Sequence, residues 1–236
     1  MVRRFLQHFK ISPIWPIHFV TFFRSSKKRR HCQSGILMTY LNISNRKMCE
    51  YDLGVGVAKM HIHNRQKSNS IEHFGFHVDT CCGSIAYTNT WNDNWPDFYF
   101  QQRLTPLVDR INNAELSTHF CELVKQKNHF YDKIKIYPSL VHGDLWSGNY
   151  NGVEDGVAIY DPGAFYAHDE FEFGMIDLFG GLGQKFYDGY RTIIPEAPGF
   201  RLRVKLYKLF HLLNHWAHFG GSYKNSSLNL LKSLLK

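Results

Sequence analysis

The sequence lacks the features that would place the chain in a membrane or in a disulfide-stabilised fold. It has no uninterrupted apolar run of the length that a transmembrane helix needs, about 20 residues. Its five cysteines are an odd number and never fall at Cys-x-x-Cys spacing, which argues against a disulfide framework and a zinc site. We therefore expect free thiols, a reducing compartment and a cytoplasmic protein with no membrane partner.

Acidic residues are the scarcer charge. There are 20 Asp and Glu against 28 Lys and Arg, which gives a net charge of +8. Such a balance suits a protein that handles ATP or another polyanion. No stacking platform or nucleic-acid motif accompanies the basic runs, so we expect no nucleic-acid partner.

The start of the chain also lacks acidic residues, and it has no glycine before Gly35. We expect an atypical basic segment over residues 1–35 and one domain over residues 36–236. An acid-free basic segment is typical of an organelle-targeting peptide. A signal peptide is a second alternative, but Pro13, Pro16 and His18 interrupt its apolar core. We favour a third, an extension or misassembled N-terminus unrelated to the rest.

One short motif carries most of the chemistry. Residues 142–149 read His-Gly-Asp-Leu-Trp-Ser-Gly-Asn, and Asp161 follows twelve residues after Asn149. His-x-Asp-x-x-x-x-Asn followed by a second Asp is the layout of a kinase-type phosphoryl-transfer site. In that layout Asp144 is the general base, and Asn149 and Asp161 hold Mg²⁺, which prefers hard oxygen ligands.

The residues around the motif favour this interpretation. Gly143 and Gly148 permit a bent loop, residues 151–156 read as a turn, and residues 157–160 read as a buried strand that ends at Asp161. The alternative is that Asp144 caps a turn and that Asp161 serves only the turn geometry before a proline.

The motif and four further stretches resemble the fructosamine kinase (ketosamine 3-kinase) family. The resemblance runs nearly colinearly from about residue 36 to residue 236. It rests on the loop at 142–149, the Asp-Pro segment at 161–166, the short blocks at 74–76 and 80–83, the tryptophan block at 89–95 and the C-terminal block at 213–220.

The resemblance implies an α+β, protein-kinase-like fold close to aminoglycoside phosphotransferases. It implies transfer of the γ-phosphate of ATP, with Mg²⁺, to the 3-hydroxyl of a ketosamine, on glycated proteins or on small ketosamines. It also implies that Met38 and Tyr40 lie in the strand and hinge under the adenine, and that Trp146 and His215 contact the substrate. From the loop position alone, an exposed sugar-stacking Trp146 and a core tryptophan are equally plausible.

Apolar spacing predicts a mostly helical lobe. Near-helical spacing runs over residues 53–64, where His61 and His63 read as structural residues and two glycines weaken the helix. Further helices are expected over 95–110, 114–130, 171–179 and 201–219, the last with Leu202 in its apolar stripe. We expect Cys81 and Cys82 to be buried, and Glu170 to form a buried pair with an unidentified partner.

A kinase of this type also needs a Gly-rich loop over the phosphates and a lysine on a strand. Neither is evident before residue 36, so we expect a rudimentary small lobe, weak ATP binding and poor turnover. Two alternatives to an active ketosamine kinase follow. One is a pseudokinase-like binding module that keeps the sugar cleft, and the other is a relative of aminoglycoside or choline kinases.

Overall fold

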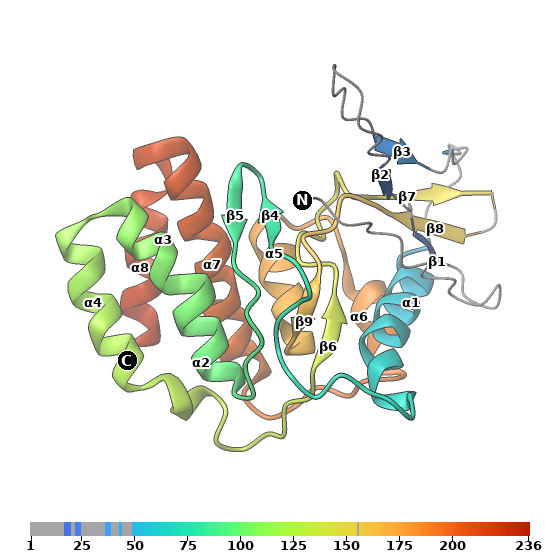
Figure 1. Ribbon diagram of the computed structural model, residues 1–236, viewed down its shortest axis with the longest axis horizontal. Coiled ribbons are helices and arrows are strands. Elements are labelled where there is room, and N and C mark those ends of the chain that lie inside the picture. Colours follow the sequence, from blue (N-terminus) through green and yellow to red (C-terminus); the bar gives the residue numbers. More distant parts are fainter. Residues whose placement is uncertain (1–16, 20–21, 25–35, 39–42, 44–48, 155) are drawn as a thin grey trace.

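The computed structural model describes residues 17–19, 22–24, 36–38, 43, 49–154 and 156–236. It places helical layers on either side of short strands (Figure 1). The helices are α1 (Glu50–His63), α2 (Trp95–Tyr99), α3 (Thr105–Ile111), α4 (Ala114–Lys125), α5 (Glu172–Phe179), α6 (Gln184–Arg191), α7 (Phe200–Phe219) and α8 (Lys224–Leu234). A π-helical segment, Phe100–Leu104, joins α2 to α3, and 3₁₀ turns lie at Asn64–Gln66, Lys127–Phe130, Asp169–Phe171 and Gly220–Tyr223.

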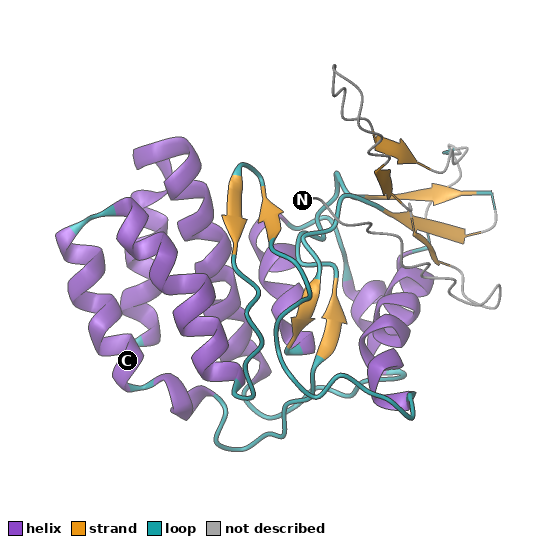
Figure 2. Ribbon diagram, in the orientation of Figure 1, coloured by secondary structure: helices purple, strands orange, loops and turns teal. Residues whose placement is uncertain are grey.

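The strands are short and form small sheets, some between the helical layers and others at the end of the molecule beside α1 (Figures 1 and 2). The strand β8 (Gly156–Ile159) pairs antiparallel with β7 (Tyr150–Val153) and parallel with β1 (Ile17–Phe19). The described residues also form three two-stranded sheets: β2 (Phe22–Arg24) with β3 (Ile36–Met38), β4 (Thr80–Cys82) with β5 (Ile85–Tyr87), and β6 (Ser139–Val141) with β9 (Phe165–Ala167).

Two apolar clusters form the core. The larger joins α2, α3, α4, α7 and α8 around Trp95 and Tyr207, whose side chains are hydrogen-bonded at 2.9 Å. The smaller joins α1, α5 and α6 around Phe173 and Phe186. The loops that carry the predicted motif run between β6, β7, β8 and β9, beside both clusters, so rigid helices support them from two sides.

The two glycines that weakened the predicted helix over 53–64 are explained in part by the crossing of α1 and α6. A Cβ atom on Gly54 would lie 2.1 Å from the backbone oxygen of Phe186. On the other helix, a Cβ atom on Gly189 would lie 2.1 Å from the backbone oxygen of Tyr51. Backbone contact this close requires glycine on both helices, and the packing offsets the low helix propensity of Gly54.

Most predicted helices are confirmed. The structure corrects the predictions on four points, two of which concern helices and two the burial of side chains. The segment 114–130 leaves the α-helix at Gln126 and continues as a 3₁₀ turn. Leu202 is 38% exposed instead of buried, and Cys81 is exposed whereas Cys82 is buried. The helices α6 and α8 were not predicted, because α6 is short and polar and α8 begins in a serine- and asparagine-rich stretch. No helix among the described residues is long and apolar enough to span a membrane.

The unidentified partner of Glu170 is Arg203, on α7. Its guanidinium donates two hydrogen bonds to the carboxylate, at 2.7 and 2.8 Å, and both side chains are almost fully buried. The same guanidinium also donates to the carbonyl oxygens of Phe130 and Pro198. A planar, bidentate pair of this kind fixes the relative orientation of its two side chains and also contributes binding energy. It joins α7 to the segment that precedes α5.

His211 is the least satisfied polar side chain in the larger core. It is fully buried, and neither ring nitrogen has a hydrogen-bond partner in the part of the chain that the structure describes. Burial lowers the pKa of its imidazole to about 3. The unfolded chain binds a proton at this position below about pH 6.5, so this histidine costs stability increasingly as the pH falls from 6.5 toward 3.

His211→Leu is therefore expected to stabilise the protein. The gain in the free energy of unfolding should be about 1–3 kcal/mol at pH 7.5, the cost of an unsatisfied buried polar group, and larger at pH 5.5. Urea denaturation at the two pH values measures it, with the exposed His129→Leu as the control. A His211→Leu variant that is less stable than the wild type at both pH values would contradict this account.

Candidate active site

The motif predicted to carry the chemistry forms one loop between β6 and β7. Tyr150 of β7 lies opposite Ile159 of β8, and the Tyr160 amide donates to the Asn149 carbonyl at 3.0 Å. This hairpin brings Asn149, which precedes β7, beside the segment that leads from β8 to Asp161. Two residues twelve apart in the sequence therefore lie at the same end of one strand pair, as expected from the predicted turn at residues 151–156.

Asp144 and Asn149 are in direct contact. The Asn149 side-chain amide donates to the Asp144 carbonyl oxygen at 2.9 Å and to its carboxylate at 3.3 Å. Burial raises the pKa of Asp144 to about 6, with the negative charges of Glu172 and Asp161 acting in the same direction and the Asn149 bond opposing them. A partly buried carboxylate with a pKa near neutrality has the properties of a general base.

His142 supports this loop through both of its ring nitrogens. Its Nε2 donates to the Tyr160 carbonyl at 2.8 Å, and its Nδ1 accepts the Asp144 amide at 3.3 Å. Burial lowers the pKa of His142, and a neutral imidazole offers the one donor and one acceptor that these two bonds use. The ring thereby ties the loop to the strand end that precedes Asp161.

Glu172 holds the loop from the other side, and the sequence did not indicate this role. Its carboxylate accepts the backbone amides of His142 at 2.6 Å and Gly143 at 3.0 Å. Burial alone would raise the pKa of Glu172, but a hydrogen bond from His61 and the neighbouring His142 hold it below its usual value. In the sequence Glu172 is one of three acidic residues at a helix start. Acidic side chains interact favourably with the helix dipole there, so the sequence offered no reason to expect a further contact with the loop.

Asp161 lies two residues beyond the end of β8 and has a backbone φ of +55°. Non-glycine residues are uncommon in this left-handed region and occur there mainly as Asn, Asp or His, frequently at functional sites. The carboxylate is exposed, and its charge acts on the pKa of Asp144. Asp161 and Asp144 therefore share one electrostatic site.

The structure describes less of the other residues that are predicted to bind the nucleotide. Met38 ends β3, whose backbone pairs with β2; its side chain and the whole of Tyr40 lie outside the described residues. Most of residues 1–35, on which the expectation of a rudimentary small lobe rests, also lie outside them. The adenine-binding roles of Met38 and Tyr40 stay predictions.

Trp146 and His215 belong to one aromatic surface. Trp146 is 39% exposed, so it is not a core tryptophan. Its ring lies 6.1 Å from that of Phe179, and Phe179 lies 5.0 Å from His215. His215 in turn contacts Phe219 and Tyr223. We call these five residues the aromatic wall; Phe179 connects its two predicted members and was not identified from the sequence.

The donor set at Asn149 and Asp161 fits a magnesium ion. The Asn149 amide nitrogen is used by Asp144, which leaves its carbonyl oxygen as an acceptor, and Asp161 adds a carboxylate. No cluster of three or more His, Cys, Asp or Glu suited to a metal exists among the described residues. Mg²⁺ does not need one, because it keeps several waters and takes substrate phosphate oxygens beside one or two protein ligands.

The raised pKa of Asp144 predicts the pH dependence of any reaction in which it accepts a proton. The carboxylate is competent only when ionised, so kcat/KM should rise with pH through an acid limb near pH 6 and level off above it. A pH–rate profile between pH 4.5 and 8.5 measures this. An acid limb near pH 4, the value of an ordinary aspartate, would show that the loop does not shift the base.

Comparison with known proteins identifies the family of the chain. The family model described as "Fructosamine kinase" matches residues 25–236. The chain is 36% identical over 227 residues to the ketosamine-3-kinase of Mus musculus, covering 86% of this chain and 73% of the mouse protein. It is 33% identical over 208 residues to a chloroplastic protein-ribulosamine 3-kinase of Oryza sativa subsp. indica, of which it spans only 59%.

Solved structures agree with the predicted fold class. A Thermobifida fusca protein described as a fructosamine-3-kinase superposes with a TM-score of 0.75 at 27% identity, covering 85% of this chain and 69% of that one. The kinase-like α+β fold, shared with aminoglycoside phosphotransferases, is thereby confirmed.

Proposed function

The chain belongs to the fructosamine kinase family, and we propose that it transfers the γ-phosphoryl group of ATP to the 3-hydroxyl of a ketosamine. The substrates are ribulosamine or fructosamine groups, on glycated proteins or on small amines, and the reaction serves protein deglycation. The proposal includes cytoplasmic residence and a domain that starts near residue 36. The observation that supports it most is the contact of Asn149 with Asp144 inside the His-x-Asp-x-x-x-x-Asn loop, within the field of Asp161.

Asp144 receives the proton in this reaction. Its carboxylate orients the attacking sugar hydroxyl and accepts its proton as the bond to phosphorus forms. Asn149 limits the rotation of the carboxylate through its hydrogen bond, and Glu172 and His142 fix the loop backbone on either side. The base is thereby held in position before substrate binds, and positioning is the main source of rate in phosphoryl transfer.

Asn149 and Asp161 would hold Mg²⁺, which when bound neutralises charge on the phosphate oxygens. The aromatic wall would hold the sugar and the amine that carries it. Exposed aromatic rings beside the base supply apolar contact area for the faces of a sugar, and His215 adds a polar edge. The aminoglycoside- or choline-kinase alternative loses support, because named relatives at 33–36% identity are ketosamine and ribulosamine kinases.

The decisive test is the isosteric variant Asp144→Asn. It should lower turnover of a ribulosamine substrate by about 100- to 10,000-fold, the usual contribution of a general base, and leave the affinity for ATP and magnesium little changed. Phosphate release and calorimetric titration measure the two quantities. Near-normal turnover would contradict the role of Asp144. No turnover by the wild type on any ketosamine would favour the pseudokinase-like alternative.

Phe179 should contribute to ketosamine binding. Phe179→Ala removes the ring between Trp146 and His215, so we expect KM for the ketosamine to rise about 10-fold, within the range of an aromatic contact, while KM for ATP stays unchanged. The control is Leu202→Ala, which removes a similarly exposed apolar side chain elsewhere. Equal KM values for the two variants would contradict the proposed wall.

A further inference from the structure

The hydrogen bonds that hold Glu172 continue away from the catalytic loop. His61 of α1 lies with Nε2 3.4 Å from the Glu172 carboxylate and with Nδ1 2.8 Å from the Tyr190 hydroxyl of α6. The Tyr190 hydroxyl donates to the Asp169 carboxylate at 3.2 Å. We call Asp169, Tyr190, His61 and Glu172 the buried relay; each is at most 6% exposed.

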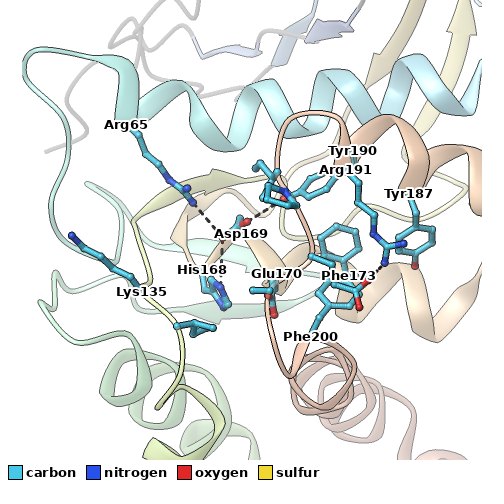
Figure 3. A pocket seen from close by; sticks show the side chains of 15 residues that line it. Arg65, Lys135, His168, Asp169, Glu170, Phe173, Tyr187, Tyr190, Arg191 and Phe200 are labelled. Atoms are coloured by element: carbon cyan, nitrogen blue, oxygen red, sulfur yellow. Dashed lines mark hydrogen bonds and ion pairs between the residues drawn. The ribbon is translucent and has the colours of Figure 1, made fainter.

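The outer end of the relay forms part of the wall of a cavity of about 210 Å³ (Figure 3). There Arg65 lies 3.4 Å from the Asp169 carboxylate, and His168 lies at 3.5 Å. The inner end is the pair of amides from His142 and Gly143 that Glu172 accepts, next to Asp144. One continuous path of polar contacts therefore joins the cavity wall to the loop of the catalytic base.

The relay has little freedom to rearrange. Both oxygens of Glu172 are in use: Oε1 accepts the Gly143 amide, and Oε2 accepts the His142 amide and lies beside His61. The backbones that carry His61 and Tyr190 are locked together by the glycine contacts between α1 and α6. Any change in the His61 ring therefore acts on the oxygen that fixes the loop, and misplacement of a catalytic group by about 1 Å can cost about 100-fold in rate.

Tyr187 offers a matched comparison on the same helix. It also lines the cavity, and its ring stacks on Phe173 at 5.7 Å. Its hydroxyl makes no hydrogen bond with the described part of the chain, whereas the Tyr190 hydroxyl bonds with both His61 and Asp169. Comparing the removal of each hydroxyl, one at a time, distinguishes an effect of the relay from an effect on the packing of α6.

We infer that Tyr190 and His61 are positioning residues for phosphoryl transfer: they hold Glu172, and through it the backbone of the catalytic loop, in the geometry that Asp144 needs. This inference rests on the proposed function for its kinetic consequence, but not for its structural one. It assigns a role in the reaction to α1 and α6, neither of which carries a residue of the predicted site.

The structural test needs no substrate. Tyr190→Phe should speed amide hydrogen exchange over residues 141–145 at least several-fold relative to the wild type, and Tyr187→Phe should leave it unchanged. Mass spectrometry of the intact 236-residue chain measures this, with thermal unfolding as the check that both variants are folded. Unchanged exchange in Tyr190→Phe would overturn the inference, whether or not the protein proves to be a ketosamine kinase.

The second test is kinetic and measures the turnover that we propose depends on Asp144. In Tyr190→Phe we expect kcat on a ribulosamine to fall about 10-fold with KM for ATP unchanged. Tyr187→Phe should match the wild type in both respects.

A double-mutant cycle tests whether the effect passes through Glu172. Tyr190→Phe should cost little further kcat in a Glu172→Gln background, because residues that act through one another are not additive. Full additivity would show that Tyr190 acts by another route and would overturn the inference. A wild-type protein without ketosamine turnover would defeat the proposed function alone, since the exchange experiment still decides the relay.

Discussion

The geometry of the candidate active site depends above all on one carboxylate. Glu172 is buried at the start of α5 and accepts two successive backbone amides of the loop that carries Asp144. A buried backbone N–H without a partner costs about as much as a lost hydrogen bond, so the loop and the helix stabilise each other. The same negative charge helps to raise the pKa of Asp144, so the residue that supports the loop also acts on the proposed base.

The neighbours of Glu172 show how one acidic segment connects several parts of the lobe. Asp169 bonds toward α6 through Tyr190, Glu170 pairs with Arg203 on α7, and Glu172 bonds to the catalytic loop. Buried charges are expensive unless they are paired and hydrogen-bonded, and each of these three has its own partners. The segment thus specifies how α6, α7 and the loop meet, in addition to any effect on the helix dipole.

The aromatic wall joins distant segments in a similar way. Trp146 comes from the catalytic loop, Phe179 from the end of α5, and His215 from α7. The helix α5 therefore begins at the support of the base and ends at the surface proposed for the sugar. A single short helix sets the spacing between the proposed base and the proposed substrate contacts.

From the sequence, the resemblance to a known family predicted the fold class. Short-range spacing predicted α5, α7 and the loop that holds Asp144 and Asn149 before Asp161, because such spacing encodes helix periodicity and turn chemistry. Only the tertiary structure decided the partners of Glu170 and Glu172, the relay through His61 and Tyr190, and the place of Phe179 between Trp146 and His215. Those contacts join residues 21 to 129 positions apart, and no local pattern specifies which of several buried polar groups will meet. The physical reason is that the joint packing of α1, α5, α6 and α7 determines which buried polar side chains come into contact. A buried charge is costly unless that packing brings a partner to it.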